Sequence, residues 1–302
     1  MASQAATEII DRRSDRPGRG ILLMCIGVAT LILLEMSAKG AAAAGVPVAQ
    51  TVWGRFAVHL LAFALIFGPR MGKNLIATGN LKIQLARSLL LLLMTLASFL
   101  ALKHLQMAQV TSIGFATPLL VAALSVPILK EVVGFHRWSA ILVGFLGVLL
   151  VVRPGMDGMH WAMLVLLGGI TCYSFYLILT RQIAGKEDPV TSVFYTALFG
   201  AIFMSLPMPW VWQTPQTGQA WAFMLLTGIF GGFAHFLIII AHQYAPASLL
   251  APFYYTQIVW SVLVGFIAFG DKPDGFTSAG AGVVIASGLY LMARERRTKR
   301  QA

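Results

Sequence analysis

Two pairs of ionisable residues stand inside stretches of sequence that are otherwise apolar. Glu35 and Lys39 are four residues apart in the first stretch, and Arg55 and His59 are four apart in the second. A spacing of four places both members on one helix face, and acid before base is the favourable order. A cluster of Glu35, Lys39 and Arg55 could bind an anionic substrate or carry a proton. A salt bridge between the first two helices, with Lys39 reaching to the surface, explains the same residues without a ligand.

A second group of candidates combines aromatic rings with polar groups. In the sequence PFYYTQIVW, Tyr254 and Gln257 are three residues apart and so share a helix face, with Tyr255 and Trp260 beside them. Rings give a planar ligand contact area, and a hydroxyl and an amide give it direction. The same residues are typical of a helical core or of the aromatic belt at a membrane surface. An earlier stretch adds three residues that could face the same cavity, Tyr173, Ser174 and Tyr176.

Pro118 lies near the middle of the fourth apolar stretch. Because proline has no backbone N–H, the carbonyl of Gly114 loses its helical donor and needs water, a side chain or a ligand instead. Hydroxyl groups near enough to compensate belong to Thr111, Ser112 and Thr117. Pro118 is therefore a candidate for a hinge or gate, although proline kinks are common in membrane helices and need not mark a site.

The composition indicates the surroundings of these residues. Hydrophobic residues make up 58% of the chain and charged residues 11%, and the mean hydropathy is +0.79. Such a chain is expected to be an integral membrane protein. Cys25 and Cys172 lie in apolar stretches and suggest neither a disulfide framework nor a metal site. The sequence contains no HExxH, no GxSxG and no pair of intramembrane aspartates, so an intramembrane enzyme is not expected.

Ten stretches are long and apolar enough to cross a bilayer as helices, for which about 20 residues suffice. The first five predicted spans are residues 21–38, 46–67, 85–102, 108–129 and 138–152. The second five are residues 161–180, 190–210, 220–241, 248–269 and 276–293. Glycines within these spans, such as Gly168 with Gly169 and Gly228 with Gly231 and Gly232, are expected to allow close helix contacts. They lack the strand-to-helix setting of a phosphate loop.

Lysine and arginine are distributed unevenly between the segments that join the spans. With the N-terminus inside, sixteen of them fall in inside segments and four in outside segments. Both termini are therefore predicted to face the cytoplasm. This distribution accounts for the net charge of +11 without a basic domain for nucleic acid.

The two halves of the sequence resemble each other. A shift of about 140 residues aligns Glu131 with Asp271 and Ala101 with Ala241. Since five spans is an odd number, the two copies must enter the membrane from opposite sides, as in secondary transporters. The predicted fold is thus an all-α membrane protein of ten transmembrane helices in two inverted five-helix repeats. The predicted parts are a cytoplasmic basic tail (1–19), the first repeat (20–155), the second repeat (160–297) and a cytoplasmic tail (298–302).

At these residues the chain resembles the drug/metabolite transporter superfamily, specifically its EamA-type members with ten helices. The resemblance rests on the unit from Pro118 to Glu131, on the sequence GFLGVLLVVRPG, and on a weaker repeat of both that ends at Asp271 and Gly288. It covers about residues 21 to 297. Glu35 and Lys39, followed by TVWGRFAVH, are similar to the bacterial subgroup that includes riboflavin transporters and S-adenosylmethionine carriers.

The resemblance implies a secondary transporter that moves a small metabolite across the bacterial inner membrane by alternating access. We expect uptake of riboflavin or a similar planar vitamin or cofactor. Export of amino acids or aromatic metabolites is the alternative, and a membrane subunit without transport is a more remote one. The expected partners are a small-molecule substrate and the lipid bilayer, with no nucleic acid and no cofactor, and a homodimer stays open.

The candidate residues form two sets. Those expected to bind substrate are Arg55, His59, Thr117, Tyr254, Tyr255, Gln257 and Trp260. Those expected to couple or gate transport are Glu35, Lys39 and Pro118.

Overall fold

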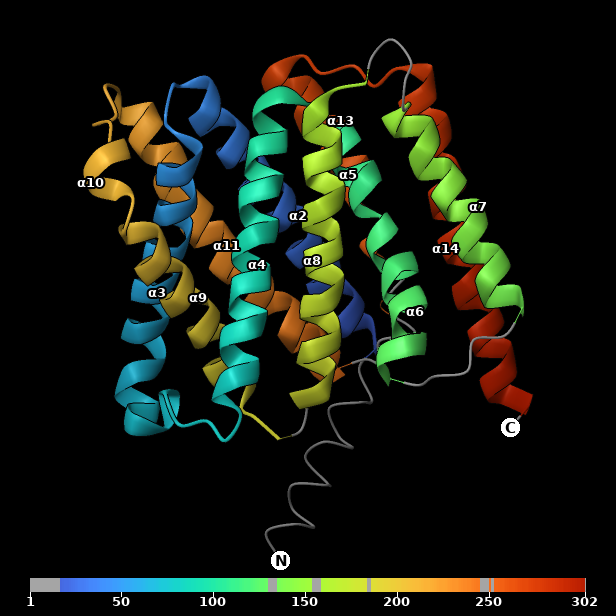
Figure 1. The fold of residues 1–302 in the computed structure, drawn as a ribbon, viewed down its shortest axis with the longest axis horizontal. Helices are drawn as coiled ribbons and strands as arrows, with labels where there is room; N and C mark the ends of the chain where they lie inside the picture. Colours follow the sequence, from blue (N-terminus) through green and yellow to red (C-terminus); the bar gives the residue numbers. More distant parts are fainter. Residues whose placement is uncertain are drawn as a thin grey trace, which may run out of the picture.

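The structure, a computed structural model, describes residues 17–129, 135–153, 159–183, 186–244, 250 and 253–301. Most of the basic tail, the charged turn at Lys130 and Glu131, and Pro246 and Pro252 lie outside the described residues. The described secondary structure is helical (Figure 1).

The helices fall into two sets that we call the first half and the second half. The first half consists of α2 (Pro17–Ala43), α3 (Val48–Met71), the 3-10 turn η1 (Gly72–Leu75), α4 (Leu81–His104), α5 (Met107–Gly114), α6 (Ala116–Leu129) and α7 (Phe135–Val152). The second half consists of α8 (Trp161–Ile183), α9 (Pro189–Ser205), α10 (Met208–Val211), α11 (Gly218–Tyr244), α13 (Gln257–Phe269) and α14 (Gly275–Gln301).

The predicted spans correspond to these helices, except that the ninth (248–269) is described as a helix from Gln257 onward and begins among residues outside the described part of the chain. Five helical segments in the described part of the chain are long and apolar enough to cross a membrane by themselves: Gly18–Ala43, Val48–Leu75, Leu81–His104, Trp161–Thr180 and Gly218–Ile238. The shorter apolar segments are Met107–Val121, Trp138–Val152, Pro189–Ser205, Gln257–Phe269 and Gly275–Tyr290. The prediction of an all-α membrane protein is confirmed.

The fourth span is broken in the way that its proline requires. α5 ends at Gly114 and α6 begins at Ala116, so Pro118 occupies the first turn of α6. A proline is tolerated there because the first N–H groups of a helix have no partner within it. In the second half, α13 begins only at Gln257, after a turn at Tyr255 and Thr256. Both halves therefore contain a short helix that starts or ends near the middle of a span.

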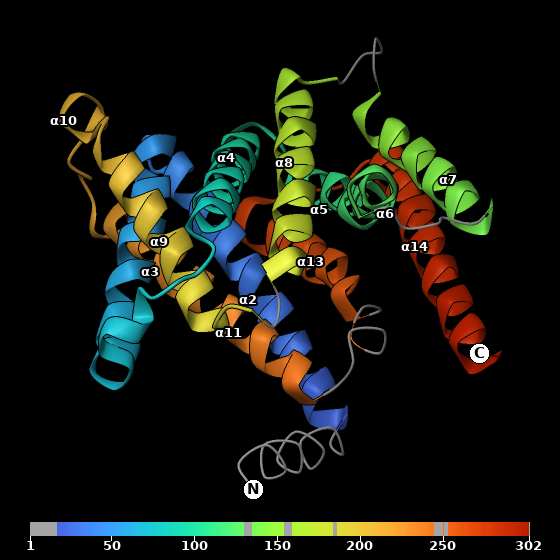
Figure 2. The same ribbon diagram turned by 60° about the horizontal axis from the view of Figure 1, so that its bottom comes forward.

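The closest helix contacts occur in exchanged pairs. α2 packs along α11, and α4 packs along α8, so the first helix of each half lies against the third helix of the other. In the same way, the contact of α3 with α11 corresponds to the contact of α9 with α4. Two further contacts, α3 with α9 and α7 with α14, each join corresponding helices of the two halves. In Figures 1 and 2, α7 and α14 lie together at one edge and α3 and α9 at the other. An axis that exchanges the two halves generates this pattern.

Glycines permit the two main exchanged contacts. A Cβ atom at Gly27 in α2 would lie 2.9 Å from the Cγ1 atom of Ile238 in α11. A Cβ atom at Gly169 in α8 would lie 2.5 Å from the Cβ atom of Ala97 in α4. Close approach of helix backbones is the expected use of such glycines in membrane helices. The expectation is correct for Gly169 but wrong for its neighbour Gly168, which has nothing within 4 Å.

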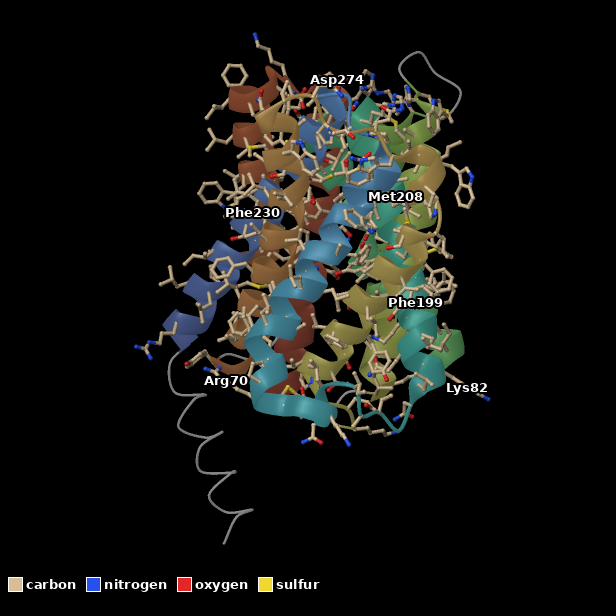
Figure 3. The ribbon with its side chains drawn as sticks, turned by 90° about the vertical axis from the view of Figure 1, so that its left-hand side faces the viewer. Arg70, Lys82, Phe199, Met208, Phe230 and Asp274 are labelled. Carbon is tan, nitrogen blue, oxygen red and sulfur yellow. The ribbon has the colours of Figure 1, made fainter. Side chains whose placement is uncertain are left out.

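The molecule has two ends along the helix axes. Arg70 and Lys82 mark one end, which we call the Arg70 end, and Asp274 marks the opposite Asp274 end (Figure 3). α2 starts and α14 finishes at the Arg70 end, whereas α8 starts at the Asp274 end (Figure 1). The first helices of the two halves thus run in opposite directions.

Candidate functional site

Glu35 and Gln257 connect the two halves in the interior. The amide nitrogen Nε2 of Gln257, the first residue of α13, donates a hydrogen bond of 3.2 Å to Oε1 of Glu35 in α2. The second carboxyl oxygen of Glu35, Oε2, is buried and has no hydrogen-bond partner among the described residues. A buried polar atom without a partner is costly. It therefore marks a place where a proton, water or ligand would be stabilising.

Arg55 lies in α3, with 6% of its surface exposed. Its Nη1 donates to the hydroxyl of Thr95 in α4, and its guanidinium lies 5.0 Å from the ring centre of Phe56 and 5.9 Å from that of Phe99. The Nε atom has no partner among the described residues. The salt bridge between Glu35 and Arg55, which the sequence left open as an alternative, is not formed in this structure, because each group bonds a neutral side chain instead.

Glycines on α11 accommodate the polar face of α3. A Cβ atom at Gly231 would lie 3.4 Å from Nε of Arg55, and one at Gly232 would lie 3.2 Å from Cδ2 of His59. At Gly228 it would lie 2.5 Å from Val58. His59 is buried, stacks edge-on against Phe63, and leaves Nε2 without a partner in the described part of the chain. Side chains as large as these fit between α3 and α11 only because α11 has no side chains there.

Aromatic rings from α8, from the break between α5 and α6, and from the residues before α13 lie in the same region as the charged groups. Tyr173 and Tyr176 in α8 stack with ring centres 5.5 Å apart. Tyr173 lies near Tyr254 and Arg55, and Tyr254 lies near Glu35. Phe115, at the break between α5 and α6, contacts Tyr255, at the turn before α13, with ring centres 5.0 Å apart. The rings and the charged residues therefore belong to one interior region, between the two broken spans.

Arg87 is a site residue that we did not select from the sequence. It lies in α4, is 2% exposed, and donates to the hydroxyls of Thr180 and Tyr176, to Oε1 of Gln84, and to the carbonyl of Ser192. Four neutral acceptors thus hold one buried cation and tie α4 to α8 and α9. In the sequence, Arg87 was marked only by its position inside a predicted span, residues 85–102.

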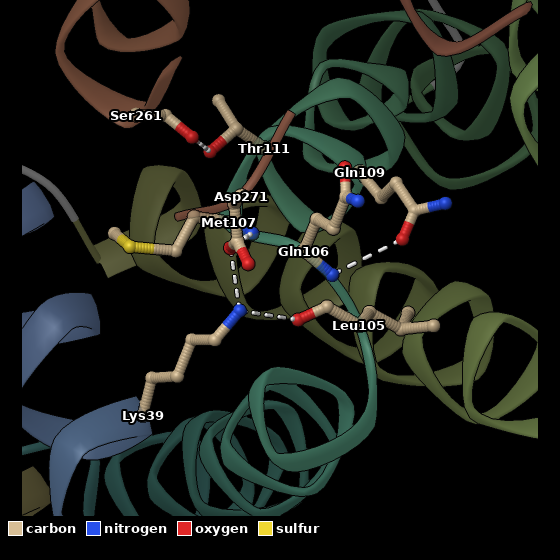
Figure 4. A network of polar contacts seen from close by, with 8 residues as sticks. All are labelled: Lys39, Leu105, Gln106, Met107, Gln109, Thr111, Ser261 and Asp271. Carbon is tan, nitrogen blue, oxygen red and sulfur yellow. Dashed lines mark hydrogen bonds and ion pairs between the residues drawn. The ribbon is translucent and has the colours of Figure 1, made fainter. Parts of the chain in front are cut away.

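Lys39 does not pair with Glu35, contrary to our expectation. Its ammonium lies 2.5 Å from Oδ2 of Asp271, in the segment between α13 and α14, and donates to the carbonyl of Leu105 at 3.1 Å (Figure 4). Asp271 was noticed only as the end of the second repeat. An i, i+4 spacing permits a pair on one helix, but Lys39 bonds two acceptors from other segments, the carboxylate of Asp271 and the carbonyl of Leu105.

The remaining candidates occupy different surroundings. Thr117 is half-buried in α6, and Tyr255 is half-buried, with its hydroxyl close to Gly288 of α14. Trp260 is 38% exposed and lines an apolar groove with Ala29, Leu33 and Met36 of α2, outside the interior region. Pro118 lies in α6, but its side chain is outside the described residues. Trp260 is thus separated from the other aromatic candidates.

The described residues include no group of three or more His, Cys, Asp or Glu that could hold a metal ion. Cys25 and Cys172 are both half-buried, in α2 and α8 respectively, and neither forms a disulfide.

Known proteins share this architecture. The EamA-like transporter family matches residues 18–153 and again residues 160–293. An S-adenosylmethionine uptake transporter of Rickettsia prowazekii is 27% identical over 80% of each chain. A riboflavin transporter of Rhizobium johnstonii is 28% identical over 79% of each. A pseudopaline exporter of Pseudomonas aeruginosa is 24% identical over 92% of this chain and 97% of its own.

A solved crystal structure shares the fold, with a TM-score of 0.65 and 19% identity over 94% of this chain and 98% of the other. The two family matches together cover most of the sequence, one in each half. The chain is therefore a multi-pass membrane transporter, not an enzyme, and it belongs to the EamA-like transporter family.

Proposed function

We propose that this protein takes up a small planar metabolite, riboflavin first, across the bacterial inner membrane by alternating access. The observation that carries the proposal is the interior region where Glu35 and Gln257 meet among the rings of Tyr173, Tyr176 and Tyr254. A flat ring system needs broad apolar contact and a few polar groups that fix its direction. Relatives named for riboflavin and S-adenosylmethionine uptake support a substrate of this shape.

The proposed orientation follows from the distribution of positive charge. Arg70 and Lys82 lie at the Arg70 end, where α2 starts and α14 finishes (Figures 1 and 3). The positive-inside rule then favours the cytoplasm for this end and the periplasm for the Asp274 end. A C-terminal reporter that is active only in the periplasm should be silent, and an active reporter would reverse the assignment.

Counterflow in liposomes tests the substrate. Vesicles with purified protein and loaded with unlabelled riboflavin should accumulate labelled riboflavin transiently, whereas vesicles without protein should not. Gln257→Ala or Tyr254→Ala should weaken binding by about 1 to 3 kcal/mol, as expected for loss of a buried polar partner. Trp260→Ala is the matched control, because it removes a ring of the same span that faces the apolar groove. Equal losses in all three variants would place the binding region elsewhere.

A second candidate function, export of amino acids or aromatic metabolites, is favoured by two particular atoms. Oε2 of Glu35 and Nε of Arg55 are both buried and lack partners among the described residues. A zwitterion could offer an ammonium group to the first and a carboxylate to the second, in charge-assisted hydrogen bonds. Riboflavin has neither charge. Vesicles loaded with a panel of amino acids would separate the candidates, since counterflow of an amino acid but not of riboflavin would favour this one.

A further inference from the structure

Lys39 and Asp271 are the centre of a compact polar network at the Asp274 end (Figure 4). Oδ2 of Asp271 receives the Lys39 ammonium at 2.5 Å and the backbone N–H of Met107 at 3.2 Å. The ammonium also donates to the carbonyl of Leu105 and lies 5.1 Å from the ring centre of Phe269. One carboxylate oxygen and one ammonium thus join α2, the turn before α5, and the end of α13.

The network is built into the helix ends that it joins. α13 finishes at Phe269, Gly270 adopts a left-handed conformation, and the N–H of Asp271 bonds the carbonyl of Gly265 at 3.1 Å. This cap turns the Asp271 side chain back toward α5. A Cβ atom at Gly265 would lie 3.4 Å from Cβ of Asp271 and 3.5 Å from Cβ of Met107. Glycine at position 265 therefore lets the turn pack closely.

α13 is attached to α2 at both of its ends. Gln257, its first residue, bonds Glu35 in the interior, and Asp271, just beyond its last residue, bonds Lys39 at the Asp274 end. A helix of 13 residues is about 20 Å long, so α13 connects the interior to that end. Between the two attachments, the hydroxyls of Thr111 in α5 and Ser261 in α13 bond at 3.0 Å. While Lys39 and Asp271 stay bonded, α2 and α13 cannot separate at the Asp274 end.

Lys39 and Asp271 are more sheltered than the other ion pair between described residues at this end. Their side chains are 15% and 14% exposed, whereas Asp274, which pairs with Arg153, is 47% exposed. Exposed ion pairs contribute little because water screens them. A sheltered pair that also bonds two backbone groups is held more firmly, and loss of one member leaves the charge of the other uncompensated.

We propose that Lys39 and Asp271 form a latch that closes the Asp274 end of the transport path and must break before that end opens. This inference deepens the proposed function, because a latch has a purpose only if the protein alternates between two open states. α13 transmits the effect: a ligand that displaces Gln257 from Glu35 frees the inner end of the helix whose outer end holds the latch.

The repeat supports this assignment at the level of sequence. The shift that superimposes Gly27 on Gly169 places Arg181 at the position of Lys39, and Glu131 aligns with Asp271. A basic residue and an acidic residue therefore recur at the related positions. The side chains of Arg181 and Glu131 lie outside the described residues, and the proposal is confined to Lys39 and Asp271.

A cysteine at position 261 tests the latch without any substrate. Ser261 is fully buried on α13, between the interior and Asp271. In full-length protein with Cys25 and Cys172 replaced by alanine, Ser261→Cys should react slowly with a membrane-impermeant maleimide. Adding Asp271→Asn or Lys39→Gln should accelerate labelling by at least about tenfold. Loss of a hydrogen bond between charged groups is expected to shift the equilibrium from the closed toward the open state by about that factor. Asp271→Asn keeps an acceptor for the N–H of Met107, so α5 retains its cap.

Asp274→Asn is the matched control, since it breaks an exposed pair in the same segment and should leave labelling unchanged. Equal labelling in the latch variants and in their parent would overturn the proposal, as would equal acceleration by Asp274→Asn. Circular dichroism of the purified variants separates unfolding from opening. If labelling accelerates as expected but no solute of the panel is moved, the latch stands and the substrate proposal fails.

Discussion

The two halves share a frame but differ in the charges that they place in the interior. Gly27 and Gly169 make equivalent close contacts, and Phe115 and Tyr255, which the repeat also aligns, touch each other. The buried charges are not repeated. Glu35 and Arg87 belong to the first half, and the related positions in the second half are Leu177 and Thr227.

The second half provides uncharged partners for these charges. Gln257 donates a hydrogen bond to Glu35. Arg87 donates hydrogen bonds to the hydroxyls of Thr180 and Tyr176 and to the carbonyl of Ser192. A symmetric frame allows two halves to exchange conformations. An asymmetric interior gives a bound substrate one preferred direction. Under the proposed mechanism, the shared frame is the part that moves, and the charges that are not repeated are the part that binds substrate.

Arg87→Ala should have the largest effect on stability, and Thr227→Ala at the related position a small one. Arg87 makes four hydrogen bonds, three of which cross to α8 and α9, so its loss should lower the free energy of unfolding by about 3 kcal/mol. Thr227 bonds only the carbonyl of Met224 in its own helix, which predicts a loss below about 1 kcal/mol. Thermal unfolding in detergent, followed by tryptophan fluorescence, measures both. Similar losses would remove the distinction between the halves.

The shared frame is tested by glycine substitutions. Gly169→Ala places a Cβ atom 2.5 Å from Ala97 and should cost about 2 kcal/mol, as overpacking usually does. Gly27→Ala should cost less, because its nearest neighbour, Cγ1 of Ile238, lies 2.9 Å away and the overlap is smaller. Gly168→Ala is the control. Nothing lies within 4 Å of it, so better helix propensity should leave stability equal or up to about 1 kcal/mol higher. The same unfolding assay reports all three, and destabilisation by Gly168→Ala would contradict the packing described.

Substitutions at Glu35 and Arg55 test whether these two buried charges act on a ligand or on each other. Each of Glu35→Gln and Arg55→Gln should reduce transport by about tenfold, equivalent to about 1.4 kcal/mol, because each removes a charge available to a ligand. Since the two groups bond different neutral partners, their effects on unfolding should add to within about 0.5 kcal/mol in the double variant.

The double variant also has two outcomes that would contradict this account. Recovery of the stability lost in the single variants would mean that Glu35 and Arg55 form an ion pair after all. Full transport by the double variant would remove both residues from the site.

The smallest effect is expected at Glu187, in the segment between α8 and α9. The amide of Asn80 holds the pKa of Glu187 below its ordinary value, aided by the N–H of Gly79. A lowered pKa adds stability above the pKa of the unfolded chain, and this is lost as the pH falls through the folded pKa. Glu187→Gln should therefore leave unfolding at neutral pH almost unchanged and reduce the loss of stability in the acid range. A large change in the free energy of unfolding at neutral pH would show that this contact between the halves stabilises the protein more than an exposed contact is expected to do.

The amino-acid sequence was sufficient for the class of protein and for the placing of the spans. Apolar stretches of about 20 residues have one stable solution in a bilayer, because every backbone group must be hydrogen-bonded within the membrane. Pro118 likewise indicated that the carbonyl of Gly114 loses its helical donor, and the break between α5 and α6 follows directly after Gly114. Such features depend on interactions between residues close together in the chain.

Only the tertiary structure decided which polar groups meet. The spacing of Glu35 and Lys39 was correct for a pair on one helix, yet their partners, Gln257 and Asp271, lie more than 200 residues away in the sequence. Arg87 was found for the same reason, through acceptors on α8 and α9. Helix packing brings these groups together, and packing depends on the shapes of whole helix faces, including the glycines that let two helices approach. A pattern within one span contains no information about the face that another span presents to it.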